Sequence, residues 1–388
     1  MAKNTIQKEN LIQEILERGV EEIIEKESLI KKLHSGKKLR VKFGIDPTKP
    51  DMHLGHTVPL LKLREFQKLG HQAVLIIGDF TAQIGDPSGQ NAERKQLSES
   101  EVKFNMKNYL RQAGKIIDIQ KTEIQYNSKW HKRSLKEFLN VTKAVTISQI
   151  MKREDFEKRI QAGGEVTVLE ALYAILQGYD SVMVRADVEI GGADQKLNLL
   201  MGRRIQKYFQ MPPQDIITLP LIEGTDGVRK MSKSYNNYIG VLEKPSEMFG
   251  KIMSIPDSLI DKYFILLTDI NPPKINNPYE KKLILAETIV KMYHLEKEAQ
   301  KAKEEFIKIF SKKETPENIP TLKLKDKELT LVELLLEADV QSKSEAKRLI
   351  IQKAVKINNK VKFNPEEKIK LEGGEILKIG KRKFFKII

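Results

Sequence analysis

The sequence predicts an α/β fold: a doubly wound, Rossmann-like catalytic domain, a helical middle domain and a small α+β domain at the C-terminus. Strand and helix patterns alternate from the N-terminus to about residue 225, as they do in parallel sheets. Helical patterns dominate residues 243–310, and short basic segments close the chain. The length of 388 residues suits two or three domains.

The first elements along the chain form a strand–helix–strand unit. Residues 4–34 are predicted to be helical, and residues 41–45 form a strand because β-branched and aromatic residues lead into an Asp-Pro break. We expect a helix from about Thr57 to Leu69, with Pro59 in its first turn. The apolar run at residues 73–77 is a second strand, so the three elements match a βαβ unit.

The same alternation continues further along the chain. Thr167–Glu170 is a capping box that opens a helix running towards Asp180. Residues 181–190 are a strand candidate closed by two glycines, and a helix from Asp194 to about Gln206 follows at once.

Composition shifts suggest four segments. Residues 1–228 are expected to form the catalytic domain, and residues 229–315 a loop with a helical domain. A polar stretch with two prolines at residues 316–328 is predicted to be a linker. Residues 329–388 form the small terminal domain.

The charge balance favours a polyanionic partner. Lys and Arg number 68 against 53 Asp and Glu, a formal net charge of +15. Nucleic acid is the first candidate, and a lysine-rich solvated surface is an equally common alternative. The 48 residues from Gln341 onward hold 14 basic and five acidic residues, so the excess is concentrated there.

Other composition features exclude several classes of protein. Cysteine is absent, which excludes disulfides, thiolate nucleophiles and cysteine-based metal sites. The N-terminal residues lack the apolar core of a signal peptide, and the apolar runs are shorter than the ~20 residues of a membrane span. We therefore expect a cytoplasmic protein with no membrane partner.

A first motif lies between a predicted strand and a predicted helix, from Asp46 to His56. His53 and His56 share a helical face, and Gly55 lets a ring or a phosphate approach the backbone. A helix N-terminus favours an anion, to which two imidazoles can donate hydrogen bonds. Alone, such an HxxH pair is more often a surface, capping or metal pair than a nucleotide site.

A second motif, KMSKS, lies in the polar segment GVRKMSKSYNN and contains Lys230 and Lys233. Taken alone, it is best interpreted as a solvated basic loop. Beside a nucleotide site, its ammonium groups can close over a triphosphate and neutralise the charge of departing pyrophosphate.

The two motifs in this order resemble the signature pair of the class I aminoacyl-tRNA synthetases. The resemblance implies that ATP is a substrate, accompanied by Mg²⁺, with no metal held by the protein itself. It implies catalytic roles for His53, His56, Lys230 and Lys233, and contact with tRNA for the helical domain within residues 229–315. It also implies that ATP is contacted by these four residues and by Gly44, Asp46, Thr48, Gly55, Gly192 and Asp194.

A polar stripe on one helix face predicts an amino-acid pocket. Tyr173, Gln177 and Asp180 are spaced along an otherwise apolar helix, where they need partners in the protein or a ligand. An internal hydrogen-bond network is the equal alternative. The spacing is similar to the tyrosine pocket of tyrosyl-tRNA synthetases, which implies that Tyr173, Gln177 and Asp86 bind the amino group. It further implies that Asp180 binds the phenol and that Gln195 lies near the carboxyl group.

The sequence departs from that family at two positions. Many bacterial relatives carry a tyrosine and a cysteine on the strand before the first motif, where they touch the phenol and the ribose. Lys42 and Phe43 stand at these places here. The resemblance therefore leaves the second phenol partner and one ribose contact open.

The C-terminal region resembles the S4 RNA-binding fold. Two capping boxes, at Thr330 and Ser342, predict two short helices, and residues 356–362 a hairpin. Lys343, Lys347 and Arg348 are the candidate RNA contacts, which act mainly through phosphates. The alternative is a basic module that stabilises a dimer.

The resemblance implies a tyrosine–tRNA ligase that forms tyrosyl-adenylate and then charges tRNA(Tyr), as a homodimer. A tryptophanyl-tRNA synthetase shares the scaffold, but Asp180 and the S4-like region disfavour it. A catalytically retired RNA-binding relative would have lost motif residues that are intact here. A small-molecule adenylyltransferase would not need the basic terminal domain.

Overall fold

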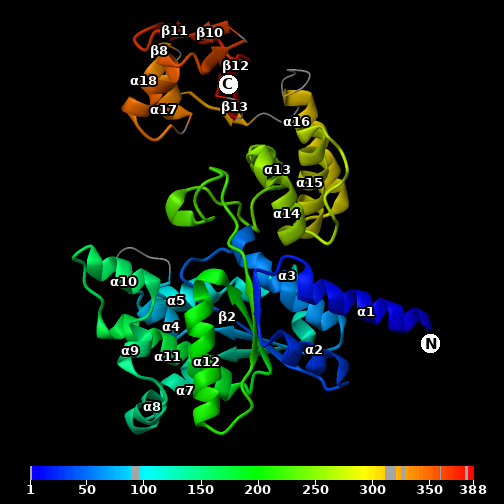
Figure 1. Cartoon of the computed structure of the whole chain (residues 1–388). Helices are drawn as coiled ribbons and strands as arrows, with labels where there is room; N and C mark the ends of the chain where they lie inside the picture. Colours follow the sequence, from blue (N-terminus) through cyan, green and yellow to red (C-terminus); the bar gives the residue numbers. More distant parts are fainter. Residues whose placement is uncertain are drawn as a thin grey trace. The chain divides into compact units, whose positions relative to one another are not determined.

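A six-stranded sheet organises the first part of the computed structural model (Figure 1). The strand order is β1-β6-β5-β2-β3-β4, and all neighbours are parallel except β1, which pairs antiparallel with β6. The strands are β1 (Glu22–Ile24), β2 (Arg40–Ile45), β3 (Gln72–Ile77), β4 (Thr122–Tyr126), β5 (Val188–Gly192) and β6 (Asp215–Leu219). The chain order reverses between β5 and β2, which confirms the doubly wound sheet.

The structure describes residues 2–88, 96–310, 320–324, 328–338, 340–358, 360–380 and 383–388. The chain divides into two compact units, Met1–Lys303 and Glu304–Ile388. Much of the segment predicted as a linker, 316–319 and 325–327, lies outside the described residues.

Helices cover both faces of the sheet (Figure 1). One face carries α1 (Ala2–Glu17), α2 (Lys26–His34) and α3 (Leu54–Lys68), and the other carries α11 (Val168–Met183) and α12 (Lys196–Tyr208). Short helices fill the chain between β3 and α11. They are α4 (Thr81–Ile84), α5 (Glu99–Met106), α6 (Tyr109–Ala113), α7 (Ser128–His131), α8 (Leu135–Thr142), α9 (Ile147–Ile150) and α10 (Glu154–Gln161).

The region after β6 is helical, as the sequence predicts. Its longer helices are α13 (Pro245–Met253), α14 (Ile260–Leu267), α15 (Pro278–Tyr293) and α16 (Glu296–Phe310). Phe249, Tyr263 and Phe264 are fully buried there and supply the core that joins α13, α14 and α15.

The second unit combines two helices with two small sheets. The capping box at Thr330 opens α17 (Leu331–Glu337), and Ser342 caps α18 (Lys343–Ile351). Strands β9 (Val355–Ile357) and β10 (Lys360–Lys362) form the predicted hairpin, and β12 (Ile376–Ile379) pairs antiparallel with β13 (Lys383–Ile387). The remaining strands are β7 (Thr321–Leu322), β8 (Glu328–Thr330) and β11 (Lys368–Lys370). Among the described residues of this unit, fifteen buried apolar side chains, including Leu331, Leu335 and Leu377, form a core.

The predicted helix over residues 4–34 is wrong in its middle. α1 ends at Glu17, and Gly19 takes a φ of 60°, a left-handed conformation that glycine adopts without strain. The next residues form the edge strand β1, whose Glu22 pairs with Thr218 of β6. The partner strand comes much later in the chain, so local helix propensity could not reveal the break.

Two further boundaries differ from the prediction. α3 begins at Leu54, with His53 as its N-cap, so Pro59 lies inside the helix and beyond the first turn. The segment 181–190 is not one strand, because α11 continues to Met183 and β5 begins only at Val188. Tertiary contacts of Ser181, described below, outweigh the β-propensity of its neighbours.

Among the residues that the structure describes, no helix is long and apolar enough to cross a membrane.

Helices α11 and α12 touch through glycines. A Cβ added to Gly178 would lie 2.8 Å from Cδ1 of Ile205 and 3.0 Å from the backbone nitrogen of Gly202. Backbone atoms cannot move aside as a flexible side chain can. The two helices therefore approach as closely as their backbones allow at this crossing.

We expect Gly178→Ala to destabilise the first unit by about 1–3 kcal/mol, the usual cost of overpacking. The measurement is urea unfolding followed by the fluorescence of Trp130, the one tryptophan of the chain. Gly250→Ala is the matched control, because a Cβ there meets no atom within 4 Å inside α13. Alanine should stabilise that helix by up to ~1 kcal/mol. Equal midpoints for both variants would contradict the close crossing.

Candidate active site

The carboxyl ends of β2 and β5 lie side by side at the centre of the sheet, where the chain order reverses. β2 leads into the segment before α3, and β5 leads through the one-turn helix η2 (Ala193–Gln195) into α12. Ligands of open α/β sheets bind at such a point.

A cavity of about 530 Å³ opens among these segments. One wall comes from residues 230–234, which carry the KMSKS motif. Eight predicted site residues line the cavity: Thr48, His53, Gly55, His56, Gly192, Asp194, Lys230 and Lys233. The two motifs, distant in sequence, therefore face one space.

His53 and His56 start α3 with their ring centroids 3.8 Å apart. Nδ1 of His53 accepts a hydrogen bond from the backbone N–H of Gly55, and Nδ1 of His56 accepts one from the backbone N–H of His53, both at 3.2 Å. A ring nitrogen that accepts carries no proton, so each neutral imidazole holds its proton on Nε2. The wall of the cavity thus contains two imidazoles with Nε2–H donors.

Burial lowers the pKa of His53 well below 6.5, and the charges of His56 and Lys233 lower it further. His53 is therefore a neutral hydrogen-bond donor at neutral pH. An anionic phosphate beside the ring would favour its charged form and raise the pKa again.

Lys230 and Lys233 have anionic partners across the cavity. Nζ of Lys230 lies 3.1 Å from Oδ2 of Asp194, and Nζ of Lys233 lies 3.4 Å from Oδ2 of Asp51. Lys233 also lies 5.5 Å from the centroid of the Tyr238 ring, within cation–π range. A phosphate ligand has to compete with these carboxylates for the ammonium groups.

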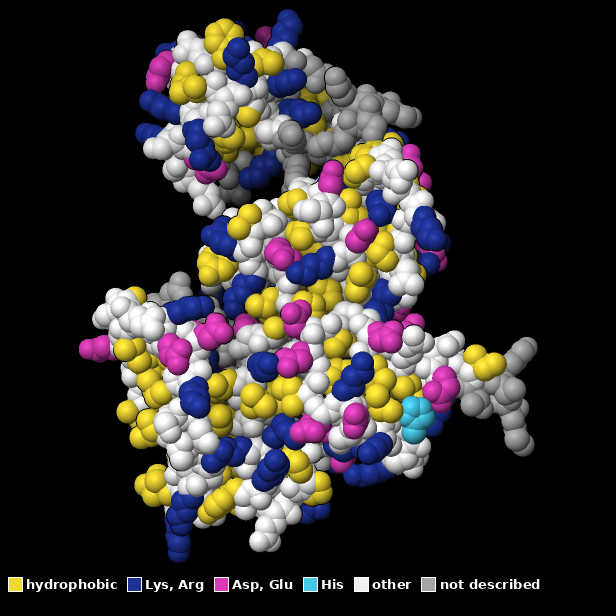
Figure 2. All heavy atoms as spheres, in the orientation of Figure 1, with side chains coloured by type: hydrophobic (Ala, Val, Ile, Leu, Met, Phe, Trp, Pro, Cys, Tyr) yellow, Lys and Arg dark blue, Asp and Glu magenta, His cyan; other side chains and the backbone are white. Residues whose placement is uncertain are grey.

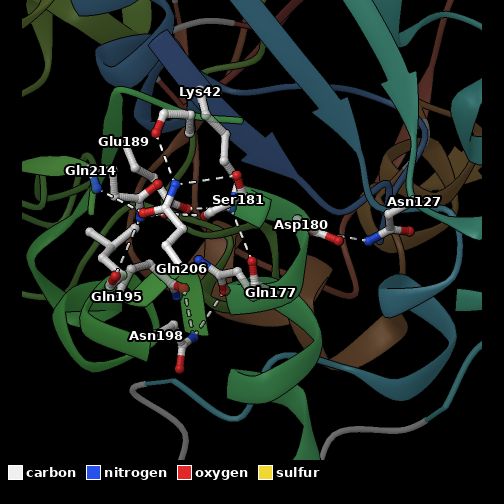
Figure 3. A network of polar contacts seen from close by, with 12 residues as sticks. Lys42, Asn127, Gln177, Asp180, Ser181, Glu189, Gln195, Asn198, Gln206 and Gln214 are labelled. Carbon is white, nitrogen blue, oxygen red and sulfur yellow. Dashed lines mark hydrogen bonds and ion pairs between the residues drawn. The ribbon is translucent and has the colours of Figure 1, made fainter. Parts of the chain in front are cut away.

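A second group of predicted residues joins a polar network around the buried Asn198 of α12 (Figure 3). Nδ2 of Asn198 donates to Oε1 of Gln177 at 3.1 Å and to Oε1 of Gln195 at 2.9 Å. Nε2 of Gln195 in turn donates to Oδ2 of Asp86 at 2.6 Å. The network therefore holds three predicted tyrosine-contacting residues through Asn198, which the sequence analysis did not identify.

Tyr173 is tied to the loop after β2. Its hydroxyl donates to Oδ2 of Asp46 at 2.9 Å, and the hydroxyl of Thr81 donates to Oδ1 at 2.7 Å. Burial raises the pKa of Tyr173 well above 10.0, and the charges of Asp46 and Asp86 raise it further. Tyr173 therefore stays protonated and donates its proton in the hydrogen bond to Asp46. The lone pairs of its oxygen can still accept hydrogen bonds.

The carboxylate of Asp180 is buried among three donors. Oδ1 accepts from Nε1 of Trp130 at 2.7 Å and has Nε2 of His131 at 2.8 Å, and Oδ2 accepts from Nδ2 of Asn127 at 3.3 Å. The sequence analysis missed all three partners, which lie at or beside the short helix α7. The one available signal was that Trp130 is the only tryptophan of the chain.

Gly44 lies in the central strand β2 and is exposed, although its neighbours Phe43 and Ile45 are buried. A Cβ added to Gly44 would meet no atom within 4 Å. The backbone of the strand is thus open at this point, and a ligand can approach it closely. Seven predicted site residues do not line the cavity that contains the two motifs: Gly44, Asp46, Asp86, Tyr173, Gln177, Asp180 and Gln195.

The predicted RNA contacts lie in the second unit, on α18. Lys343, Lys347 and Arg348 are exposed, whereas Ala346 and Ile350 of the same helix are buried in the core. Lys347 lies 3.3 Å from Glu366, and Arg348 lies 3.8 Å from Glu345. Exposed pairs at such distances contribute little and are readily exchanged for phosphate.

Comparisons with known proteins agree on one family. A family model described as "tRNA synthetases class I (W and Y)" matches residues 34–311. The tyrosine–tRNA ligase of Aquifex aeolicus is 48% identical over 382 residues, which cover 96% of this chain and 97% of the relative. That of Carboxydothermus hydrogenoformans is 48% identical over 399 residues and 97% of each chain.

Solved structures of tyrosyl-tRNA synthetases share the fold. A C-terminally truncated mitochondrial enzyme of Aspergillus nidulans has a TM-score of 0.65 at 21% identity, covering 80% of this chain and 100% of that chain. The enzyme of Archaeoglobus fulgidus, in complex with L-tyrosine, has a TM-score of 0.60 at 20% identity, covering 76% and 99%. At these identities the likeness establishes the fold alone.

The histidine geometry predicts the outcome of an NMR titration. We expect His53 to remain neutral, with its proton on Nε2, as the pH falls through 6.5, because its pKa is depressed. His34 should protonate at a higher pH, because the Ile30 carbonyl and Glu9 raise its pKa. Nitrogen-15 spectra of the imidazoles, assigned with His53→Asn, make the measurement. A His53 signal that titrates at or above 6.5 would contradict the geometry.

Proposed function

This chain belongs to the class I tRNA synthetases of the tryptophan and tyrosine family, and we propose that the cavity and its polar network carry out both steps of tyrosine attachment to tRNA. Its activity is that of a tyrosine–tRNA ligase. ATP and L-tyrosine give tyrosyl-adenylate and pyrophosphate, and the tyrosyl group passes to the terminal adenosine of tRNA(Tyr). The observation that carries the proposed site is the buried carboxylate of Asp180.

Asp180 selects the phenol. Two donors occupy Oδ1. Among the residues that the structure describes, only Asn127 donates to Oδ2, at 3.3 Å, so this oxygen keeps a lone pair for another donor. The hydroxyl of tyrosine supplies that donor. Phenylalanine has none and would leave the buried oxygen without its bond, a cost greater than that of a missing methylene.

Three acceptors on neighbouring elements bind the substrate ammonium. The Tyr173 hydroxyl donates a hydrogen bond to Asp46, so the lone pairs of its oxygen are available as acceptors. Oε1 of Gln177 accepts one bond from Asn198 and keeps a second acceptor position. Asp86 adds the negative charge. Gln195, which donates one amide proton to Asp86, keeps a second for the substrate carboxylate.

Activation is an in-line displacement at the α-phosphorus of ATP. The carboxylate of tyrosine attacks as an anion and needs no general base. The Nε2–H groups of His53 and His56 stabilise the pentacoordinate phosphate, and Lys230 and Lys233 neutralise the departing pyrophosphate. Catalysis is mostly positioning and charge stabilisation.

ATP binding changes the partner of Lys230. Asp194 is the proposed ligand of the ribose hydroxyls, yet it pairs with Lys230 in the structure. A ribose that hydrogen-bonds Asp194 competes with Lys230 and leaves its ammonium for the phosphates. The carboxylate thus couples nucleoside recognition to the placement of the KMSKS lysine. A ribose hydroxyl of tRNA then attacks the adenylate in the second displacement.

Mg²⁺ enters with the phosphates of ATP in this proposal. Within the described parts of the chain, no group of three or more His, Asp or Glu side chains could hold a metal ion. Phosphate and water oxygens are ligands that Mg²⁺ accepts readily.

The second unit is the proposed RNA-binding module. Figure 2 shows lysine and arginine side chains spread over its visible face. Lys343, Lys347 and Arg348 are exposed on α18 and can contact phosphates without disturbing the core.

A homodimer is proposed from exposed apolar side chains on α8, α9 and α10. Leu135 is 70% exposed, Ile147 79% and Ile160 47%. Figure 2 shows hydrophobic side chains on the side of the first unit where Figure 1 places these helices. Such side chains favour burial against a second copy of the chain.

We expect Asp180→Asn to lower kcat/KM for tyrosine by about 10- to 150-fold, because a hydrogen bond to a charged group contributes ~1.5–3 kcal/mol. The measurement is amino-acid-dependent exchange of pyrophosphate into ATP, with tyrosine, phenylalanine and tryptophan compared. Glu137→Gln is the control. Glu137 of α8 accepts a hydrogen bond from the hydroxyl of Tyr179 on α11, and neither residue belongs to the proposed site. Exchange with tryptophan would show that the chain uses the substrate of a tryptophanyl-tRNA synthetase. The absence of exchange with any of the three amino acids would reject the activation step.

The RNA proposal has its own test. We expect Lys347→Ala/Arg348→Ala to weaken tRNA binding and to reduce the slope of log affinity against log salt by up to about 2, since each phosphate contact accounts for about 1. Tyrosine-dependent exchange should stay at its wild-type rate. The matched control is Lys26→Ala/Lys31→Ala, an exposed basic pair on α2. An equal loss of binding in both double variants would indicate a general charge effect and contradict the assignment.

A further inference from the structure

A buried ion pair lies beside the proposed tyrosine site and takes no part in the reaction described above. Lys42, in the middle of β2, is 0% exposed, and Glu189, its register partner on β5, is 1% exposed. Nζ of Lys42 lies 2.7 Å from Oε1 of Glu189. Taking two charges out of water is costly, so such a pair persists only where its geometry is well satisfied.

Each proton of the Lys42 ammonium has an acceptor. Besides Glu189, Nζ donates to the backbone carbonyl of Gln177 at 3.0 Å and to the hydroxyl of Ser181 at 2.8 Å (Figure 3). An ammonium group has three donors, so none is left for a ligand. Lys42 therefore does not serve as the second phenol partner, although it occupies the strand position that supplies one in many relatives.

Glu189 is also satisfied on both oxygens. Its Oε2 accepts from the hydroxyl of Ser181 at 2.9 Å and from Nε2 of Gln214. Ser181 thus accepts from Lys42 and donates to Glu189, and it closes a ring of three side chains (Figure 3). The ring joins β2, β5 and α11.

The Lys42 ammonium group contacts α11 at two residues that are one helical turn apart. Gln177 and Ser181 are four residues apart and lie on the same helix face. Contacts at both points fix the position of the helix along its axis and its rotation about that axis. The same helix carries Tyr173 and Asp180, so its placement decides where the proposed amino-group and phenol ligands stand.

Helix α12 packs closely against the same part of α11. Gly178 touches the backbone of α12, and a Cβ on Gly202 would lie 2.9 Å from the hydroxyl of Ser181 and 3.2 Å from Oε2 of Glu189. The Lys42 ammonium and the α12 backbone therefore both restrict the position of α11.

We propose that Lys42 is a positioning residue for tyrosine: held by Glu189, its ammonium fixes α11 so that Gln177 and Asp180 meet the substrate. An apolar pair of similar volume would pack the same space and tolerate small shifts of the helix, whereas the ion pair is satisfied in one arrangement. The inference rests on the proposed function, since it assigns Lys42 to the tyrosine site of that reaction.

The test compares KM values in pyrophosphate exchange with the full-length protein. We expect Lys42→Met to raise KM for tyrosine about 10-fold or more, because small displacements of a binding group from remote changes are costly. KM for ATP should change much less, because His53 and His56 stand at the start of α3, whereas Lys42 contacts α11 and β5. A general loss of structure would raise both KM values.

Lys62→Met is the matched control. Lys62 is 3% exposed, donates to the backbone carbonyls of Ile15 and Arg18, and lies 2.6 Å from Glu65. Its loss also leaves buried acceptors without a donor, but far from the tyrosine network. We expect a comparable drop in the unfolding midpoint and no change in KM for tyrosine.

The double variant Lys42→Met/Glu189→Met keeps the test valid if Lys42→Met alone does not fold, because it leaves no unpaired buried charge. We expect stability closer to wild type with KM for tyrosine still raised. Wild-type KM for tyrosine in either folded variant would overturn the inference.

Gln177→Ala separates this inference from the proposed function. If wild type shows no tyrosine-dependent exchange, the proposed function fails and the inference falls with it. If wild type is active and Gln177→Ala raises KM for tyrosine while the Lys42 variants do not, the inference alone is wrong.

Discussion

The parallel pairing of β2 with β5 is the contact on which the rest of the active site depends, and Lys42 stands opposite Glu189 in its register. The chain leaves β2 through the segment that caps α3 with His53, and it leaves β5 through the turn that presents Asp194. A slip of one residue would set Lys42 against Val188 or Ile190 and leave two buried charges unpaired. The ion pair is therefore satisfied only in the register that brings the two halves of the proposed nucleotide site together.

Within this frame, the polar groups of the site are already paired with one another. Lys230 pairs with Asp194, Tyr173 donates to Asp46, and Gln195 donates to Asp86. In the proposed reaction, tyrosine binds at the donor and acceptor positions that these pairs leave open. The pairs keep the polar groups satisfied without ligand, and they orient each acceptor before the substrate arrives. ATP binding instead exchanges the partner of Asp194, which releases the ammonium group of Lys230 for the phosphates.

The parts of the fold that the sequence predicted correctly are those set by local patterns. The strands at residues 41–45 and 73–77 and the capping box at Thr167 follow from hydrophobic runs and side-chain caps. The strand β1 and the true end of α11 were missed, because each depends on a partner far along the chain: β6 for the first, Lys42 for the second. The partners of Asp180 were missed for the same reason. α7 has four residues and no periodicity that could mark Trp130 or His131 as neighbours of a carboxylate on another helix.

The two buried lysines Lys62 and Lys42 have different acceptors, and the acceptors determine which element each ammonium group can position. Lys62 donates to carbonyls near the C-terminus of α1, where the helix dipole favours a cation, and burial nevertheless lowers its pKa. The acceptors of Lys62 lie at the C-terminal end of α1, a helix that carries none of the proposed site residues. Lys42 instead meets a carboxylate on the neighbouring strand and a carbonyl in the middle of α11. A mid-helix carbonyl already has its own amide partner in the next turn, so the added bond is not needed for helix formation. What the bond adds is a fixed distance between the central strand and the helix that presents Gln177 and Asp180. A site that distinguishes two amino acids by one hydroxyl needs that distance to be constant.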